Sequence, residues 1–452
     1  MRKNHLWKVA VIAVVLGAMA GCKGKNGNLV GETKKSKTSD YPVVEISEGL
    51  ANSSKYFSYV HEFVNGLAIV ENNDKLGLID MNGRDVVSCK YSRIERIGKA
   101  FATYEKDGWG HAKCGALSPD GKEILPCTIV SEDLHFFPDA ETIVISSPYP
   151  SNYRFIDFKG NSLAGSGLSA DYMRNSSDWT DDYAYVRWTK EFVDRCGKIV
   201  FKANKQNGVS WLEDAQGNVI VPQKYSDFGT YDCTYDSGIL ITSNNGYYGL
   251  WDIKNKKEIV SPTTYDYILC DKDMTGYEHF VKDGMIVVKI KSKYGVISKD
   301  GTEIINPQFA DIKIEKGLII AQREGGLSET EGVYDISGKE LVACDYSSIE
   351  IGDNSIHAEK KDEDYNTIYS LFDREGNLLF KSEKEIEYVG LLCEGLSVIK
   401  KSGLYGYCDE DGDVVIEPKY EWAGDFSEGL APVKKNGICG YVNHGGKDSF
   451  TE

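Results

Sequence analysis

The chain has 452 residues, of which 41% are hydrophobic, 11% aromatic and 27% charged, and its formal net charge is −17. This composition supplies enough apolar material for a continuous core and excludes a wholly disordered chain. The acidic balance disfavours nucleic acid as a partner, because phosphate contacts need a local basic patch and no Lys/Arg cluster stands out after residue 40. With 28 Tyr, 46 Gly and 11 Pro, the composition favours short β-strands joined by tight turns.

Residues 1–21 have the order of a secretory signal peptide: basic residues, an apolar run, then small residues before Cys22. The apolar run is too short to span a bilayer comfortably. Met19-Ala20-Gly21-Cys22 resembles the lipobox of bacterial lipoproteins, with Met19 where Leu is commoner. The resemblance implies cleavage before Cys22 and lipid attachment at Cys22. An ordinary signal peptide or an uncleaved anchor is the alternative.

Residues 22–40 are polar, rich in Gly, Ser and Lys, and without periodicity, which predicts a flexible tether. Several acyl chains on Cys22 would hold the chain firmly at a membrane. We therefore expect an exported protein that is lipid-anchored to the cell envelope. By resemblance to lipoproteins of bacteria with two membranes, Lys23 favours the outer membrane, because it replaces the Asp associated with inner-membrane retention. The sequence does not choose between a periplasmic and a surface-exposed body.

An internal repeat occupies residues 41–452. Its clearest copies are residues 76–91 and 405–420. Each begins with Tyr or Leu followed by Gly, and continues with a strand, an Asp/Asn-Gly type turn, a Val/Ile pair, then Pro or Cys, and Tyr. Residues 294–309 and 332–346 follow the same pattern. The turn recurs about every 34 to 44 residues, which is typical of repeat architectures whose units bury their core faces against their neighbours. We expect about ten units of about 38 residues each.

Three strands are evident in each unit: an alternating run such as residues 429–435, and the two strands that flank the turn. The Pro-x-Tyr tail is expected to bend the chain toward the next unit. The last unit lacks this tail, whereas residues 42–60 resemble the tail of a unit whose earlier strands are missing. Pairing of these halves would remove exposed strand edges. The predicted fold is therefore all-β, with tandem antiparallel β-meander repeats in a propeller-like ring, and an open β-solenoid is the alternative.

Residues 429–435, together with Tyr405-Gly406 and Pro418-Lys419-Tyr420, resemble the bacterial WG repeat. The resemblance covers nearly all of the expected repeat domain, although the Trp of the name occurs before Gly only at Trp109-Gly110. The family implies a β-repeat scaffold without catalytic residues, so the resemblance carries over no chemistry.

Residues that could support chemistry are scattered. None of the cysteines after Cys22 forms a CxxC pair, and we interpret them as small buried hydrophobes, with disulfides between neighbouring units as the alternative. The histidines are too dispersed for a metal motif, so we expect no metal and no cofactor. We interpret residues 409–413 as a structural turn rather than a calcium loop, and 362–364 as a solvated loop.

Tryptophans and tyrosines could form a carbohydrate-stacking surface, but core packing is the more general interpretation. The tryptophans concerned are Trp179, Trp188, Trp211, Trp251 and Trp422.

These observations predict a membrane-anchored, non-enzymatic binding or scaffold module of the cell envelope. Loops from successive units would form an extended site for a protein or glycan partner. The alternative is a propeller-type enzyme acting on glycans, a hydrolase or lyase, in which two carboxylates from different units meet in a cleft. A carboxyl pair with a raised pKa in a cleft would favour the enzyme.

Overall fold

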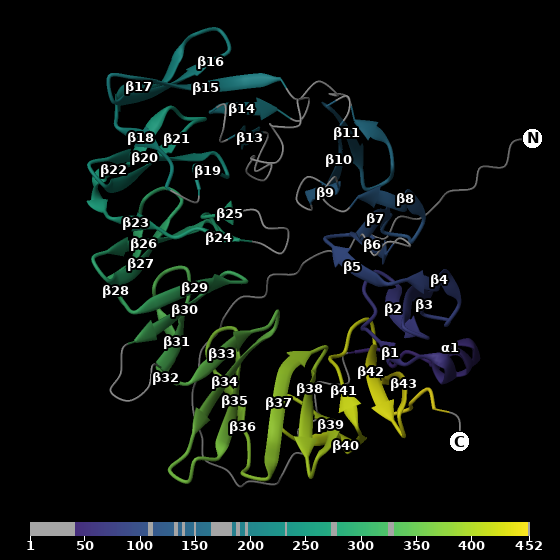
Figure 1. Cartoon of the computed structure of the whole chain (residues 1–452). Coiled ribbons are helices and arrows are strands. Elements are labelled where there is room, and N and C mark those ends of the chain that lie inside the picture. Colours follow the sequence, from purple (N-terminus) through teal and green to yellow (C-terminus); the bar gives the residue numbers. More distant parts are fainter. Residues whose placement is uncertain are drawn as a thin grey trace, which may run out of the picture. The chain divides into compact units, whose positions relative to one another are not determined.

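The computed structural model describes residues 41–450 except 107–111, 131–133, 138–140, 149–150, 164–182, 187–189, 195–197, 231–232, 273–277 and 324–329. In the described residues the fold is almost entirely β, with one short α-helix, so the prediction of an all-β repeat protein is confirmed (Figure 1). The expected signal peptide, the tether with Cys22, and Trp109 lie outside the described residues. None of the helices in the described part of the chain has the length and apolar character that a membrane-spanning helix requires.

The strands form a series of small antiparallel sheets, most of them with four strands that follow one another in chain order. Helix α1 (Glu48–Ser53) and the 3₁₀ helix η2 (Ser54–Tyr56) precede the first sheet. The sheets of the first half are β1 Tyr59–Val60, β2 Leu67–Asn72, β3 Lys75–Asp80 and β4 Asp85–Tyr91; β5 Arg93–Ile97, β6 Ala100–Lys106, β7 Ala112–Leu117 and β8 Glu123–Val130; β9 Leu134–Phe137, β10 Thr142–Pro148, β11 Ser151–Asp157 and β12 Ser162–Leu163; β13 Tyr183–Val186, β14 Glu191–Asp194, β15 Ile199–Gln206, β16 Val209–Asp214 and β17 Val219–Tyr225; and β18 Asp227–Phe228, β19 Tyr235–Asp236, β20 Ile239–Asn244, β21 Tyr247–Asp252 and β22 Lys257–Tyr265.

The second half continues the series, with a small separate hairpin of β24 (Asp271–Lys272) and β25 (Glu278–His279). Its sheets are β23 Tyr267–Ile268, β26 Met285–Ile290, β27 Lys293–Ser298 and β28 Glu303–Phe309; β29 Asp311–Glu315, β30 Leu318–Arg323, β31 Thr330–Tyr334 and β32 Glu340–Tyr346; β33 Ser348–Ile351, β34 Ser355–Lys361, β35 Thr367–Asp373 and β36 Leu378–Lys381; β37 Ile386–Cys393, β38 Leu396–Lys401, β39 Leu404–Cys408 and β40 Val414–Tyr420; and β41 Trp422–Ala423, β42 Leu430–Lys435 and β43 Ile438–Asn443.

Each unit therefore has a fourth strand beyond the three that are evident in the sequence. It is the first strand of the sheet, and it is as short as two residues in β41. The Pro of the Pro-x-Tyr tail lies inside the last strand rather than after it, since Pro418 belongs to β40. There it faces Gly406 of β39, at a shift in the strand register between Tyr405 and Tyr407. The bend that we expected at Pro is thus a β-bulge within the sheet.

Neighbouring sheets pack through the turn between the third and fourth strands. A Cβ added at Gly338 would lie 2.3 Å from the carbonyl oxygen of Ile304 in the preceding sheet, and one at Gly376 would lie 2.5 Å from that of Leu341. A residue without a side chain is therefore needed at this contact. Shared hydrophobic clusters continue the packing, as between sheets β23–β28 and β29–β32. Each unit thus completes its core against its neighbour, as repeat architectures require.

A second contact between sheets uses the turn that joins the first and second strands. The carboxylate of Asp283 accepts a hydrogen bond from the N–H of Gly317 at 2.7 Å, and that of Glu394 accepts one from the N–H of Gly429 at 2.8 Å. In both pairs an acidic residue just before one turn glycine accepts from the corresponding glycine of the next sheet. These bonds satisfy backbone donors that strand pairing leaves free.

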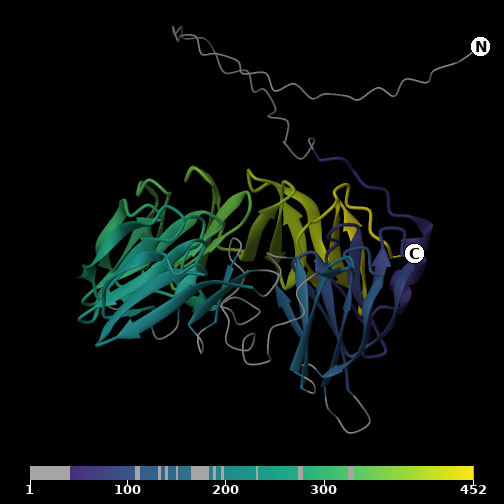
Figure 2. The ribbon, with the colours of Figure 1, turned by 90° about the horizontal axis from the view of Figure 1, so that it is seen from above.

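The last sheet contacts the first in the same way. The Glu428 carboxylate accepts a hydrogen bond from the N–H of Gly66 at 2.8 Å, and the Tyr441 hydroxyl donates to the carbonyl of His61 at 2.8 Å. One hydrophobic cluster contains residues of both ends, among them Leu50 and Leu430. Figures 1 and 2 show β41–β43 next to β1 and α1. This is the contact that the closed arrangement requires between its first and last units.

Helix α1 occupies the position that a fourth strand has at the other contacts. A Cβ added at Gly83, the turn glycine of the first sheet, would lie 2.5 Å from the Cα of Leu50, whereas at most other contacts, as at Gly338, the turn glycine meets the fourth strand of the preceding sheet. The last sheet has three strands, β41 to β43. The N-terminal segment thus complements the incomplete last unit, as the sequence predicts, but it does so with a helix where a strand-like tail was expected.

Candidate functional site

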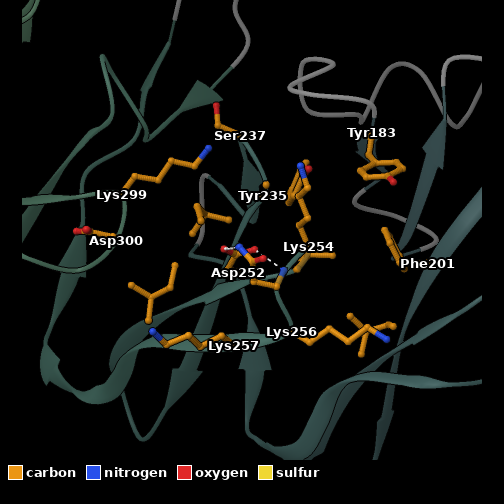
Figure 3. A pocket seen from close by; sticks show the side chains of 16 residues that line it. Tyr183, Phe201, Tyr235, Ser237, Asp252, Lys254, Lys256, Lys257, Lys299 and Asp300 are labelled. Atoms are coloured by element: carbon orange, nitrogen blue, oxygen red, sulfur yellow. Dashed lines mark hydrogen bonds between the residues drawn. The ribbon is translucent and has the colours of Figure 1, made fainter.

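A cavity of about 1180 Å³ lies where three consecutive sheets meet, and we call it the lysine cavity. One part of its wall comes from β13, β15 and β17, and another comes from the turn between β21 and β22 (Figure 3). The turn between β27 and β28 adds Lys299 and Asp300. Its size is that of sites that enclose small molecules or short oligomers.

The turn that forms the cavity departs from the repeat. In other units an Asp, Ser or Asn begins the turn and Gly follows three positions later, as in Asp335 to Gly338. Here the turn from Asp252 is one residue longer, and the position with positive φ is Lys256, at +52°. A residue with a Cβ rarely adopts this conformation, because the backbone is then strained.

Four lysines surround the cavity: Lys254, Lys256, Lys257 and Lys299. Within the described part of the chain, none of their amines forms an ion pair. The three lysines of the turn are exposed, and Figure 3 shows Lys257 and Lys299 across the cavity from Tyr183 and Phe201. Like charges held this close repel one another unless an anion lies among them.

The opposite wall is aromatic and apolar. The rings of Tyr183 and Phe201 are 5.2 Å apart between centroids and meet edge to face, at an interplanar angle of 72°. Both side chains are only partly buried, and Ile220 lies beside them. A second cavity of about 660 Å³ shares these three residues and Lys256, so the two spaces adjoin along the same wall.

The carboxylates of the lysine cavity are engaged in their own turns. Asp252 accepts hydrogen bonds from the N–H of Asn255 at 2.9 Å and from its side-chain amide at 2.7 Å. Asp300 accepts from the Ser298 hydroxyl and from the N–H of Thr302, and these hydrogen bonds lower the pKa of Asp300. Both carboxylates are therefore held by hydrogen bonds within their own turns.

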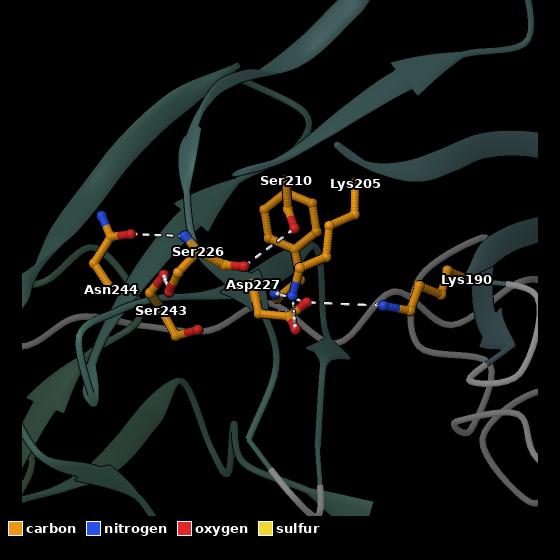
Figure 4. A network of polar contacts seen from close by, with 8 residues as sticks. Lys190, Lys205, Ser210, Ser226, Asp227, Ser243 and Asn244 are labelled. Atoms are coloured by element: carbon orange, nitrogen blue, oxygen red, sulfur yellow. Dashed lines mark hydrogen bonds and ion pairs between the residues drawn. The ribbon is translucent and has the colours of Figure 1, made fainter. Parts of the chain in front are cut away.

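A polar network fixes the two sheets that form most of the cavity (Figure 4). Asp227 of β18 accepts a hydrogen bond from Lys205 of β15 at 2.7 Å and pairs with Lys190 at 3.8 Å. Burial acts to raise the pKa of Asp227, but the bond from Lys205 and the two positive charges outweigh it and lower the pKa. The Ser226 N–H donates to the Asn244 side chain at 2.7 Å. These lysines are paired, in contrast to those of the cavity.

The structure changes one interpretation from the sequence and agrees with others. We expected no basic cluster beyond the tether, whereas Lys254, Lys256 and Lys257 form one within a single turn. Asp409 accepts hydrogen bonds from the N–H groups of Asp411 and Asp413, so this stretch is a structural turn. Among the described residues, no group of three or more metal-ligating side chains is close enough to hold an ion.

The cysteines in the described residues are free thiols; four of them are buried, as we interpreted them, and the other five are partly buried. Of the tryptophans, Trp251 is buried in a core cluster and Trp211 donates to Glu213, while Trp179 and Trp188 lie outside the described residues. The aromatic wall of the cavity instead uses Tyr183 and Phe201, which the sequence analysis did not single out.

The fold and the site define a β-repeat protein with a cavity across adjoining units. The model of the WG containing repeat matches residues 54–75, 294–326 and 405–437, so the chain carries WG repeats and the resemblance is confirmed. No curated protein matches the chain.

Similar solved structures include a eukaryotic initiation factor, at 11% identity over 72% of this chain and 88% of that chain, with a TM-score of 0.37. They also include dipeptidyl peptidase 4 of Porphyromonas gingivalis, at 10% identity over 79% and 67%, with a TM-score of 0.34. Likenesses at this level carry no conclusion about function.

Proposed function

We propose that the chain is a non-enzymatic binding module, held at the cell envelope by lipid on Cys22, and that the lysine cavity is its ligand site. The WG repeats and the β-repeat body fit a binding or scaffold module. The lipobox-like Met19-Ala20-Gly21-Cys22 supports the anchor. The outer membrane is the membrane that Lys23 favours.

One observation carries the binding proposal. The lysine cavity combines four lysine amines that form no ion pair among the described residues with an aromatic wall, and its two carboxylates are already engaged in turn hydrogen bonds. Such a site offers charge and stacking to a ligand. It also spans three successive units, which suits an extended partner.

A substitution that fills the cavity tests whether it is the ligand site. Lys254→Trp places an indole at the mouth of the cavity, and Lys75→Trp makes the same change at an exposed lysine of β3 away from it. The full-length wild type and both variants are used to capture glycan and protein from the native envelope. We expect Lys254→Trp alone to lose the captured material. Equal capture by all three proteins would contradict the cavity as the ligand site.

The test of the anchor is Cys22→Ala. If lipid on Cys22 holds the chain, the variant is lost from the outer membrane, because Ala offers no thiol to carry the acyl chains that anchor it there. Retention of Cys22→Ala in the outer membrane, in the same amount as wild type, would contradict lipid anchoring.

A second candidate function, a glycan hydrolase or lyase, is favoured by Asp425. Crowding by protein atoms raises the pKa of Asp425, and the nearby carboxylates of Glu350 and Glu62 raise it further. Its side chain is still exposed, so water limits the rise. The three carboxylates come from three different units, as the enzyme alternative requires: Glu350 lies in β33, and Glu62 and Asp425 follow β1 and β41. Turnover of a glycan by the purified chain that is lost in Asp425→Asn, with capture unchanged, would establish this function instead of binding alone.

A further inference from the structure

We infer that the lysine cavity binds an acidic carbohydrate, a chain of uronic acid units; this rests on the proposal that the cavity is the ligand site. The positive charge of the lysine cavity is the first observation that favours such a ligand. The chain is acidic overall, at −17, yet four lysines gather at one cavity without an ion pair among the described residues. Elsewhere in the described chain, single exposed lysines such as Lys75 are also without an ion pair, whereas Lys205 pairs with Asp227 and Lys224 with Glu258. What distinguishes the cavity is that four such lysines line one space. The cavity therefore presents positive charge that a ligand can neutralise.

The second step is the kind of anion. Lysine is a compact charge on a flexible stem, whereas arginine offers the planar fork that matches phosphate in two contacts at once. Both cavities are lined by lysines, and no arginine is among their lining residues. Carboxylates placed at intervals along a ligand suit such separate, adjustable amines. The net negative charge of the chain also repels densely charged polyphosphates at long range.

The third step is the rest of the ligand. The rings of Tyr183 and Phe201 face Lys257 and Lys299 across the cavity and are only partly buried (Figure 3). Partly exposed aromatic rings offer an apolar surface on which the C–H face of a sugar ring can pack. The adjoining second cavity continues this wall and adds the exposed Lys198. A ligand with sugar rings and regularly spaced carboxylates matches charge, stacking and length together.

The regularity of the repeat gives an independent sign that this turn is specialised. The extra residue of the turn and the positive φ of Lys256 replace a glycine that other units use for packing. Strain of this kind persists where the surrounding structure or a function requires it. Here it directs two further lysines, Lys254 and Lys257, to the cavity.

The experiment compares charged and uncharged forms of one ligand. Short oligogalacturonates and oligoalginates are titrated calorimetrically into the full-length chain in detergent, and the methyl esters of the same oligogalacturonates serve as the uncharged counterpart. We expect the acids to bind, the esters to bind at least about ten-fold more weakly (about 1.4 kcal/mol), and added salt to weaken the acids alone.

Matched variants locate the contact. Lys254→Gln, Lys256→Gln and Lys257→Gln together should weaken binding of the acids at least about ten-fold. The control combines Lys75→Gln, Lys381→Gln and Lys447→Gln, three exposed lysines that line neither cavity and make no ion pair among the described residues, and it should leave binding within about two-fold. Melting temperatures of both triple variants check that they fold.

The outcomes separate this inference from the proposed function. No binding of any uronate oligomer, equal binding of acids and esters, or no effect of the cavity variants would overturn the acidic-carbohydrate inference. Equal competition by a single-stranded oligonucleotide would show a general polyanion site and overturn it too. If Lys254→Trp still abolishes capture from the envelope, the cavity remains the ligand site and only the ligand class is wrong. If capture is unaffected, the proposed function itself fails.

Discussion

A glycine of the third strand faces Pro or Cys of the fourth strand in several units. A Cβ at Gly406 would lie 2.4 Å from the carbonyl oxygen of Ile416 and 2.7 Å from the nitrogen of Pro418. The two strands approach this closely at a bulge, where Gly406 alone on β39 faces residues 417–419 of β40. Pro is tolerated there because it has no N–H to pair. Cys is an alternative because its thiol can donate to a carbonyl of the second strand, as Cys344 does to Ala321 at 3.5 Å.

This explanation predicts a large loss of stability for one change at a bulge and a small effect for another change at the same bulge. Gly332→Ala would place its Cβ 2.7 Å from the nitrogen of Cys344 and 2.8 Å from the carbonyl oxygen of Val342, so we expect a loss of about 2 kcal/mol or more in unfolding free energy. Cys344→Pro, which copies other units, should change it by less than about 1 kcal/mol. Urea unfolding of both variants measures this. A larger loss for Cys344→Pro than for Gly332→Ala would refute the explanation.

His357 predicts a pH dependence of stability. It lies in the core at 4% exposure, and burial lowers its pKa to about 4 from the usual 6.5. The unfolded chain therefore binds the extra proton between these values. The contribution of neutral His357 to the free energy of unfolding is complete above about pH 6.5. It declines by up to about 3 kcal/mol as the pH falls to about 4. His357→Phe should retain the stacking on Tyr369 and remove this decline. Identical pH profiles of melting temperature for wild type and variant would show that His357 does not titrate on unfolding.

At the scale of elements, the hairpin-forming strands follow directly from the sequence and the first strand of each sheet does not. The turns are predictable from the sequence, because an Asp or Ser before Gly accepts hydrogen bonds from local N–H groups, as Asp409 does. First strands such as β41 are too short for an alternating pattern to show. Helix α1 was missed although its signal is present: the Ser47 hydroxyl accepts from the N–H of Leu50 at 3.0 Å, and Glu48 is in the first turn.

The candidate site was only partly predictable for a related reason. Lys254, Lys256 and Lys257 are visible in the sequence, but three lysines in one turn are ordinarily a solvated loop. Their partners in the cavity, Tyr183 and Lys299, belong to other sheets. Only the packing of three sheets shows that these residues share a cavity. The sequence predicts that loops of successive units form a site, but it cannot say which loops.

Restoring the regular turn tests whether the cavity depends on its irregular form. Deleting Asn255 and changing Lys256→Gly gives the turn the length and glycine of other units. Relief of the positive φ at a non-glycine residue should keep or raise stability, by up to about 1 kcal/mol. The same variant should lose capture by the cavity, because two of its polar residues are gone. Melting temperature and capture from the envelope are measured together. A stable variant that still captures fully would show that the turn is not part of the site.

At the scale of the whole molecule, the contact between the ends repeats the contact between neighbours. Glu428 accepts from Gly66 as Glu394 accepts from Gly429 and Asp283 from Gly317. Such a pairing of residues at opposite ends of the chain has no local signal, and the sequence indicates it only through the incomplete last unit and the tail-like residues 42–60. The contact covers the packing face that an end unit otherwise exposes.

This junction should open before the rest of the array when its core is weakened. Leu50 is fully buried in the cluster that both ends share, so Leu50→Ala should lower stability by about 2–5 kcal/mol. Repeat units interact with their neighbours only, so the loss should be local. Hydrogen exchange should rise in β43 and β2 and stay unchanged in β26 to β28. Leu371→Ala, at an equally buried residue of β35, is the control and should act on its own sheet and its neighbours. Faster exchange spread evenly over all sheets of Leu50→Ala would show that the array unfolds as one unit, and the end contact would then be no weaker or more separable than any other.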